Sequence, residues 1–241
     1  MYIDKGIKNM KPIIGIVGKE AVHDENDLWH RFDVVDEFIY LVNKHGGNSI
    51  CLLPTEPTMQ FNQNDTGDDT VLTEQQLEDL KQQLDLCDGL ILQGGEYSCQ
   101  YEVELAKMAL ERDMPIIGTC AGFNNILRAL GSHTWEDKTK KHSIYKKDYR
   151  HAITIEKDSL LYDFIGQEEY QVNSLHTMMA NVEDVQPYAR VTALSYDGYV
   201  EAFQPEGKRF VCAVKWHPEQ MMEEEYVDKM FEAFVQACKE K

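Results

Sequence analysis

The feature that most constrains the fold is a series of four short apolar runs in the first half of the chain. They occupy residues 12–17, 49–53, 88–92 and 115–119. Short apolar runs of this kind are typical of strands that are buried on both faces of a parallel sheet. Because parallel strands need crossover connections, the runs predict βαβ units with helices on both faces of the sheet.

The segments between these runs carry helical periodicity. The first predicted helix stops at residues 45–47, and its apolar face has residues at steps of four and three: Leu28, Phe32, Val35, Ile39 and Val42. A second helix is predicted to start at a capping box formed by Thr73 and Gln76. A third is predicted near residues 101–112. Residues 55–71 are polar, acidic and without periodicity, which indicates a surface loop.

The second half of the chain has a different sequence pattern. Five short strand patterns separated by turns occupy residues 151–156, 170–173, 190–195, 199–204 and 210–216. They carry no linker, so we expect them to extend the same sheet, and residues 223–240 have the period of a closing helix. The prediction is a three-layer α/β fold with a mostly parallel sheet and a small antiparallel extension. We expect a single domain over residues 1–241, with residues 1–10 as an N-terminal tail.

The net charge limits the range of partners. The 241 residues include 42 acidic and 24 basic side chains, which give a formal charge of -18. Such a charge repels nucleic acid and anionic membrane surfaces, so we expect neither as a partner. No secretory leader and no apolar stretch of membrane-spanning length is present, and the six cysteines lack paired spacing. We therefore expect a cytoplasmic protein without disulfides.

A lone cysteine follows the fourth apolar run. Residues 118–122 read G-T-C-A-G, the thiol counterpart of a nucleophile elbow between a strand and a helix. Cys120 would then lie at a helix N-terminus, where a thiolate is stabilised. The N–H of Ala121 could stabilise an oxyanion, and Gly95, after the third run, could supply a second donor. The other cysteines fit core positions, except Cys99, which we expect in a loop.

A thiolate nucleophile needs a base, and the base needs a group that orients it. His217 follows the last strand pattern, and Glu219 lies two residues further in W-H-P-E. Positions two apart in an extended segment face the same side, so Glu219 could orient His217 toward Cys120. The zinc deaminase pattern also contains H-x-E, but its P-C-x-x-C partner is absent here. A structural zinc site is not expected, and no cofactor is expected.

Several motifs in this order resemble a known family. They are K-P-I-I-G-I-V-G, H-G-G-N-S-I-C-L-L-P, L-I-L-Q-G-G, P-I-I-G-T-C-A-G, H-A-I-T-I-E-K-D-S-L-L, V-N-S-L-H, D-G-Y-V-E-A-F and V-K-W-H-P-E. The chain resembles the class I glutamine amidotransferase-like superfamily, with its flavodoxin-like sheet, and within it the gamma-glutamyl-gamma-aminobutyrate hydrolase family.

The resemblance implies roles for particular residues. It implies a Cys120–His217–Glu219 triad, oxyanion donors at Gly95 and Ala121, and attack on a small γ-glutamyl substrate. It also implies a substrate pocket that involves four residues: Gly94, Asn124, Ser174 and His176.

Three departures from the family pattern bear on specificity. Ala121 stands where relatives carry arginine, Asn124 stands where they carry glutamine, and only residues 96–100 separate the double glycine from the next helix. The sequence supports three hypotheses for the function: a γ-glutamyl amide hydrolase, a glutaminase subunit that supplies ammonia to a separate synthetase, and a non-catalytic regulatory module. The sequence leaves open a homodimer and the identity of the released amine.

Overall fold

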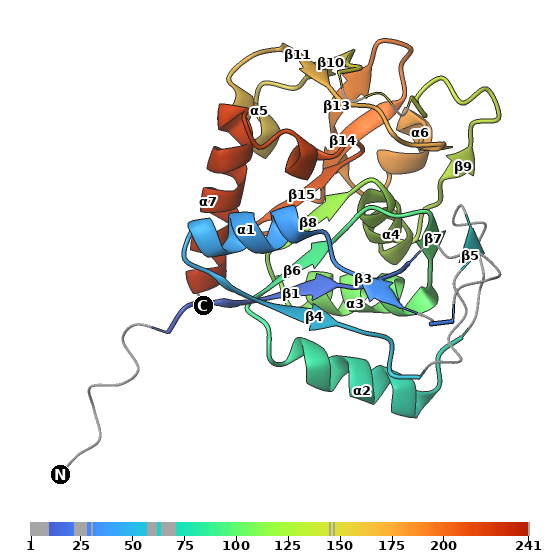
Figure 1. Cartoon of the computed structure of the whole chain (residues 1–241). Helices are drawn as coiled ribbons and strands as arrows, with labels where there is room; N and C mark the ends of the chain where they lie inside the picture. The colour runs from blue at the N-terminus through green and yellow to red at the C-terminus, as the bar shows by residue number, and fades with distance from the viewer. Residues whose placement is uncertain are drawn as a thin grey trace.

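The structure is a computed structural model, and it describes residues 10–21, 28–29, 31–56, 62–63, 71–144, 146 and 148–240. The predicted tail at residues 1–10 and the predicted loop at residues 55–71 lie mostly outside these residues. Strands and helices alternate over the first 130 residues, and residues 151–240 add strands, three α-helices and a 3-10 helix (Figure 1).

One nine-stranded sheet runs through the molecule in the order β11-β10-β13-β14-β15-β8-β6-β1-β4. Its parallel core contains β15 (Val211–Val214), β8 (Ile116–Thr119), β6 (Gly89–Leu92), β1 (Ile13–Val17) and β4 (Asn48–Leu52). The antiparallel extension contains β14 (Val200–Gln204), β13 (Arg190–Ser195), β10 (His151–Ile155) and β11 (Glu169–Val172). The predicted α/β fold with an antiparallel extension is confirmed.

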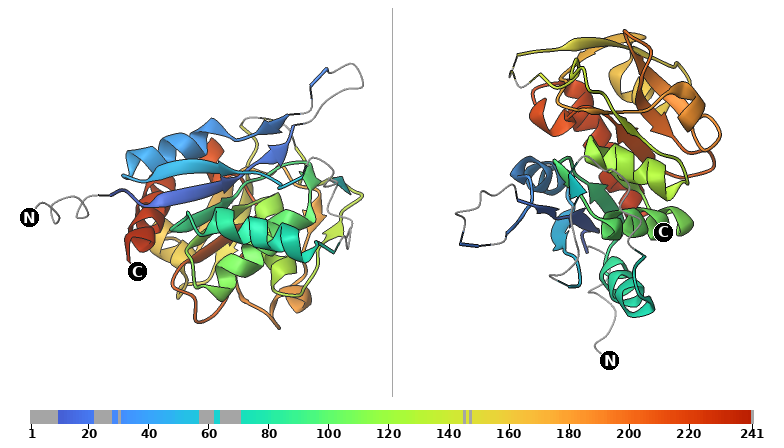
Figure 2. Two further views of the ribbon diagram at one scale, coloured as in Figure 1. Left: turned by 90° about the horizontal axis from the view of Figure 1, so that it is seen from below. Right: turned by 90° about the vertical axis from the view of Figure 1, so that its right-hand side faces the viewer.

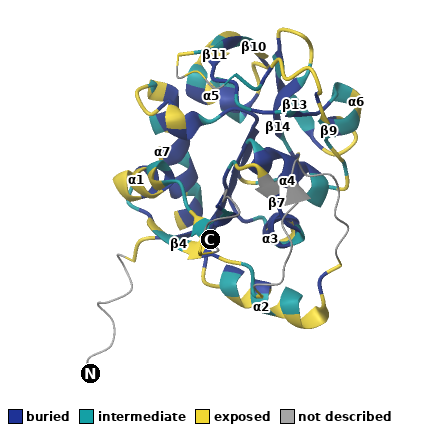
Figure 3. Cartoon of the chain, turned by 45° about the vertical axis from the view of Figure 1, so that its right-hand side comes forward, coloured by how far each residue is buried: buried dark blue, intermediate teal, exposed yellow. Residues whose placement is uncertain are grey.

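Helices cover both faces of the sheet. One apolar cluster contains residues of α2 (Glu74–Leu84), α3 (Gln100–Glu111), α4 (Ala121–Ala129) and α6 (Val182–Val185). The cluster on the other face contains residues of α1 (Asp36–Lys44), α5 (Leu160–Ile165) and α7 (Glu225–Lys239). Figure 2 shows α1 and α2 on opposite sides of the sheet. The central strands are buried between the two helical layers, as Figure 3 shows.

Short elements complete the fold. Three two-stranded pairs join β2 (Lys19–Glu20) to β3 (Phe32–Asp33), β5 (Asn62–Gln63) to β7 (Tyr97–Ser98), and β9 (Trp135–Glu136) to β12 (Met178–Met179). A 3-10 helix, η1, spans Pro218–Gln220 directly after His217. No described helix is long and apolar enough to cross a bilayer.

The local predictions had mixed outcomes. The capping box of Thr73 and Gln76 is confirmed at the start of α2. The first helix was predicted too long, because Leu28 is 86% exposed and Phe32 belongs to β3, which pairs with β2.

The predicted apolar face of that helix is confirmed only at Val42, because Ile39 is exposed. The buried residues of α1 are Phe38, Leu41 and Val42. Cys99 lies, as predicted, in the short connection between β7 and α3, where it is the buried N-cap residue of α3.

Candidate active site

The register of the parallel strands brings the predicted residues together. Leu92 in β6 pairs with Gly118 in β8, so the double glycine and Cys120 follow neighbouring strand ends. Thr119 pairs with Val214 in β15, so the segment that leads to His217 lies on the other side of Cys120. Three segments that are far apart in the sequence therefore meet at the carboxyl edge of the sheet, where α/β sheets bind ligands.

Cys120 lies at a strained turn between β8 and α4. Its backbone has φ 51° and ψ -103°, a conformation that a residue with a Cβ rarely adopts. The turn is possible because Gly122 lies against β6. A Cβ at Gly122 would lie 1.9 Å from the Leu92 carbonyl oxygen. The elbow predicted from the glycine spacing is therefore present, with the thiol at the N-terminus of α4.

His217 is held from two sides. Its Nδ1 lies 2.6 Å from Oε1 of Glu219, a carboxylate that is 1% exposed. The backbone of His217 is fixed by Asn173, whose side chain donates to the His217 carbonyl at 2.8 Å and accepts from its N–H at 2.8 Å. With Nδ1–H donated to Glu219, the other ring nitrogen of His217 remains available to Cys120, whose pKa the charge of His217 lowers.

Cys120 and His217 form a charged pair. Burial raises the pKa of the Cys120 thiol, but the charge and hydrogen bond of His217 and the ammonium of Lys215 outweigh burial, so the pKa falls below its ordinary value. Burial lowers the pKa of His217, whereas Glu219 and Cys120 raise it, and the net result lies well above the ordinary value. Both shifts favour a thiolate next to an imidazolium, the form in which cysteine acts as a nucleophile.

A cavity of about 500 Å³ opens over this pair. Cys120, His217 and both predicted oxyanion donors, Gly95 and Ala121, contribute to its lining. The N–H groups of Gly95 and Ala121 donate to no other described residue, which leaves them available to a ligand. Three charged side chains also line the cavity: Glu96, Glu136 and Lys140.

The four residues predicted to form the substrate pocket differ in their positions relative to the cavity. Asn124 and His176 line the cavity, and both are buried. Gly94 packs behind the pair, because a Cβ there would lie 2.5 Å from Cε1 of His217 and 3.2 Å from Cβ of Cys120. Ser174 is 1% exposed and its hydroxyl donates to the His142 carbonyl at 2.8 Å, so it does not line the cavity.

The residues that depart from the expected family pattern lie at or near the cavity. Ala121 lines the cavity at the position where arginine was expected. Asn124 accepts a hydrogen bond from the buried ammonium of Lys215, which also lies 4.5 Å from the centre of the Phe123 ring. Because α3 begins at Gln100, only residues 96–99 separate the double glycine from this helix.

Sequence reasoning missed two residues that support the site. Asn173 positions His217 through its two hydrogen bonds, and Lys215 helps to lower the pKa of Cys120. The sequence could have identified Lys215, because a lysine inside the apolar run F-V-C-A-V-K-W is unusual for a buried strand. Asn173 left no such signal, since its role depends on a contact between residues 44 positions apart.

The chain is similar in sequence to a protein family and to individual known proteins. A profile of the family described as Peptidase C26 matches residues 98–219, a range that contains Cys120, His217 and Glu219. The glutamine amidotransferase-like protein YvdE of Lactococcus lactis is 27% identical, and the match covers 92% of this chain and 97% of that protein. The gamma-glutamyl-gamma-aminobutyrate hydrolase of Escherichia coli O157:H7 is 32% identical over 56% of this chain and 58% of its own length.

A solved structure has the same fold. A glutamine amidotransferase from Thermotoga maritima superposes with a TM-score of 0.61 at 14% sequence identity, over 96% of this chain and 100% of that chain. At this level of identity the superposition establishes the architecture alone. It agrees with the fold class predicted from the alternation of strands and helices.

Proposed function

The chain belongs to the glutamine amidotransferase-like hydrolases of the Peptidase C26 family, and on this premise we propose that it cleaves a γ-glutamyl amide through a thioester on Cys120. The observation that carries the proposal is the Cys120–His217–Glu219 arrangement at the cavity. The pair is poised for nucleophilic attack, and a carboxylate orients its imidazole.

The proposed reaction has two steps. The Cys120 thiolate attacks the γ-carbonyl carbon, and the N–H groups of Gly95 and Ala121 stabilise the oxyanion; one such donor contributes about 3 kcal/mol to lowering the barrier. The His217 imidazolium then gives its proton to the amine as the C–N bond breaks, which leaves a γ-glutamyl thioester. His217, now neutral, takes a proton from water, and the resulting hydroxide attacks the thioester and releases glutamate with the Cys120 thiolate.

The charges at the cavity support a γ-glutamyl group as the substrate. This group carries an α-ammonium and an α-carboxylate at the end remote from the scissile bond. The cavity has acidic side chains at Glu96 and Glu136 and a basic one at Lys140, which could bind the two charged groups. The E. coli relative named a gamma-glutamyl-gamma-aminobutyrate hydrolase supports the same substrate class.

A glutaminase subunit is the second candidate. Glutamine is the γ-glutamyl amide of ammonia, so the same residues would perform the same two steps. This candidate is favoured by the nearly full-length relative named glutamine amidotransferase-like. It requires a separate synthetase as a partner to receive the ammonia.

A panel of substrates tests the proposal. The purified full-length protein is incubated with glutamine and with γ-glutamyl derivatives of amines and amino acids, and free glutamate is measured. We expect a γ-glutamyl amine or amino acid to have a higher kcat/KM than glutamine. Turnover of glutamine alone, stimulated by a synthetase, would favour the second candidate. Absence of glutamate release from every compound would contradict both.

A further inference from the structure

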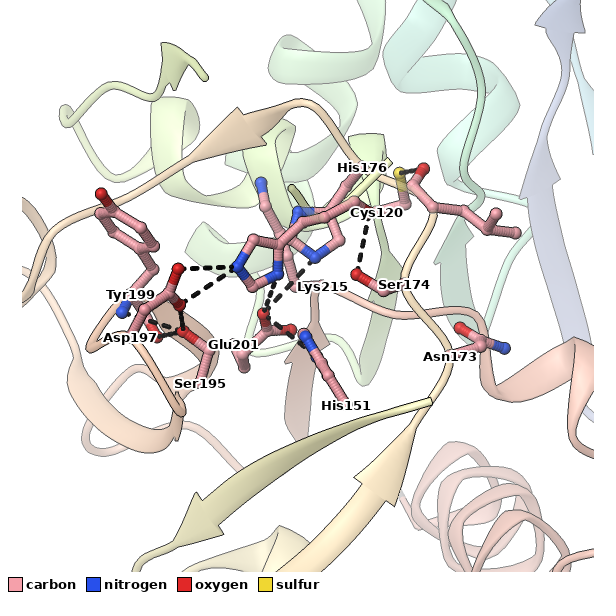
Figure 4. Close-up of polar contacts among 12 residues, drawn as sticks. Cys120, His151, Asn173, Ser174, His176, Ser195, Asp197, Tyr199, Glu201 and Lys215 are labelled. Atoms are coloured by element: carbon pink, nitrogen blue, oxygen red, sulfur yellow. Dashed lines mark hydrogen bonds and ion pairs between the residues drawn. The ribbon is translucent and has the colours of Figure 1, made fainter. Parts of the chain in front are cut away.

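A second cluster of buried polar side chains lies next to the active site. His142, His151 and His176 are 1%, 5% and 3% exposed, and Glu201 is fully buried at 0%. His151 begins β10 and Glu201 lies in β14, whereas the other two histidines come from loops. Figure 4 shows the rings of His151 and His176 directed at the Glu201 carboxylate.

The distances in the cluster are too long for ordinary hydrogen bonds. Oε1 of Glu201 lies 3.5 Å from Nδ1 of His142, 3.5 Å from Nε2 of His151 and 3.4 Å from Nε2 of His176. Typical N–H···O bonds are about 2.9–3.0 Å long. All four of these atoms are buried without a hydrogen-bond partner among the described residues. Such atoms are costly to bury unless something else fills the space between them.

The distances from Oε1 of Glu201 to the imidazole nitrogens match the distance between two ligand atoms in a tetrahedral metal site. Zinc bonds to nitrogen and oxygen of about 2.0–2.1 Å place neighbouring ligand atoms about 3.3–3.4 Å apart in a tetrahedron. An octahedral ion with similar bond lengths would bring them to about 2.9 Å. One ligand atom from each of His142, His151 and Glu201 lies within 4.8 Å of the other two. Nε2 of His176 lies 3.4 Å from the same carboxylate oxygen but does not belong to this set of mutually close atoms.

We propose that His142, His151 and Glu201 bind a zinc ion beside the active site. Two imidazole nitrogens and one carboxylate oxygen, with the fourth position left to water or another ligand, form a ligand set that suits zinc. The nearby ammonium of Lys215, which is held by Asn124, repels a dication and weakens its binding. This site and the catalytic cysteine are separate, because no ligand atom belongs to Cys120, His217 or Glu219.

The surrounding residues orient the ligands. Asp197 lies 3.1 Å from Nε2 of His142 and is itself bonded at 2.7 Å by the hydroxyl of Ser195. With Nε2–H donated to Asp197, the Nδ1 lone pair of His142 faces Glu201, as a metal ligand requires. The His142 carbonyl accepts from the N–H of His176 at 3.0 Å and from Ser174, which fixes the two loops to each other.

A bound ion would lie next to one wall of the active site. His176 lines the catalytic cavity, and the carbonyl oxygen of its neighbour Leu175 lies 4.0 Å from the Cys120 sulfur. Zinc on His142 would therefore fix this wall, because the His142 carbonyl accepts from the N–H of His176. We expect the ion to stabilise the fold, because a ligand that binds only the folded state raises the melting temperature.

Cobalt(II) titration of the full-length Cys120→Ala protein tests the site without relying on activity. This variant removes the active-site thiol, which could bind metal by itself. After treatment with a chelator, we expect one equivalent of cobalt to produce the intense visible bands of a tetrahedral site, without a thiolate charge-transfer band. Zinc should displace the cobalt and raise the melting temperature.

Two further substitutions in the same background locate the binding. His151→Ala should abolish the visible bands, whereas His133→Ala, which alters a histidine with a 71% exposed side chain, should leave them unchanged. Circular dichroism reports whether each variant folds. Absence of tetrahedral cobalt binding in the parent Cys120→Ala protein would overturn the proposal, even if His151→Ala fails to fold. Equal binding by folded His151→Ala would also overturn it.

Discussion

Substitution of Cys120 by alanine is expected to lower kcat by about 10⁴- to 10⁶-fold, the range seen when a nucleophile is removed from a catalytic triad. Without the sulfur no thioester forms, and His217 has no thiolate partner. The fold should survive, because alanine at the start of α4 keeps the turn and removes only a half-buried thiol. The measurement is the rate of glutamate release from the best substrate of the panel.

Cys51→Ala provides the matched control. Cys51 is an exposed cysteine in β4, the strand at the edge of the sheet, which β1 separates from β6. We expect this variant to retain the activity of the unmodified protein and its sensitivity to thiol reagents that inactivate the enzyme. Turnover by Cys120→Ala above a small fraction of the normal rate would show that another group performs the attack.

Substitution of Glu219 by glutamine should lower kcat by about 10²- to 10⁴-fold, as loss of the group that orients a catalytic histidine does in other triads. Burial lowers the pKa of His217, and Glu219 is the strongest of the groups that raise it. In the variant the charge of Glu219 is lost, so the pKa of His217 falls. Since the imidazolium must protonate the leaving amine, activity is lost above the pKa of His217.

The pH dependence of kcat/KM therefore distinguishes this role from a structural one. In Glu219→Gln the alkaline limb of the curve should move to lower pH. Glu223→Gln, which alters an exposed carboxylate of the same segment, should leave both limbs in place. An unchanged alkaline limb in Glu219→Gln, with activity lowered at every pH, would show that Glu219 maintains the local structure and does not control the charge of His217.

The sequence predicts the sheet well because its signals are local. Each apolar run contains its own evidence of burial, and the strands at 13–17, 48–52, 89–92 and 116–119 lie within a residue or so of the predictions. The first helix was misjudged because Leu28, Phe32 and Val35 have helical spacing by coincidence. Phe32 pairs with Glu20 in a small antiparallel ribbon instead, and only tertiary structure reveals that pairing.

Some residues of the candidate site could also be predicted from local sequence signals, and others could not. Cys120 was identifiable because glycines on both sides mark a tight turn, and W-H-P-E marks His217 and Glu219. The histidine cluster could not be found from spacing, since His142, His151, His176 and Glu201 come from separate loops and strands. Metal ligands are easiest to recognise in a sequence when two of them lie a few residues apart, whereas these residues meet only through the antiparallel extension.

The charge state of Cys120 is the central claim, and the ultraviolet absorbance of its thiolate measures it directly. The difference in absorbance between the unmodified protein and Cys120→Ala is followed as the pH is lowered from above neutrality. We predict that the thiolate signal persists well below the ordinary pKa of a free thiol, about 8.5, and that His217→Ala abolishes this persistence. A signal that disappears near the ordinary thiol pKa, or that is the same with and without His217, would contradict the ion pair.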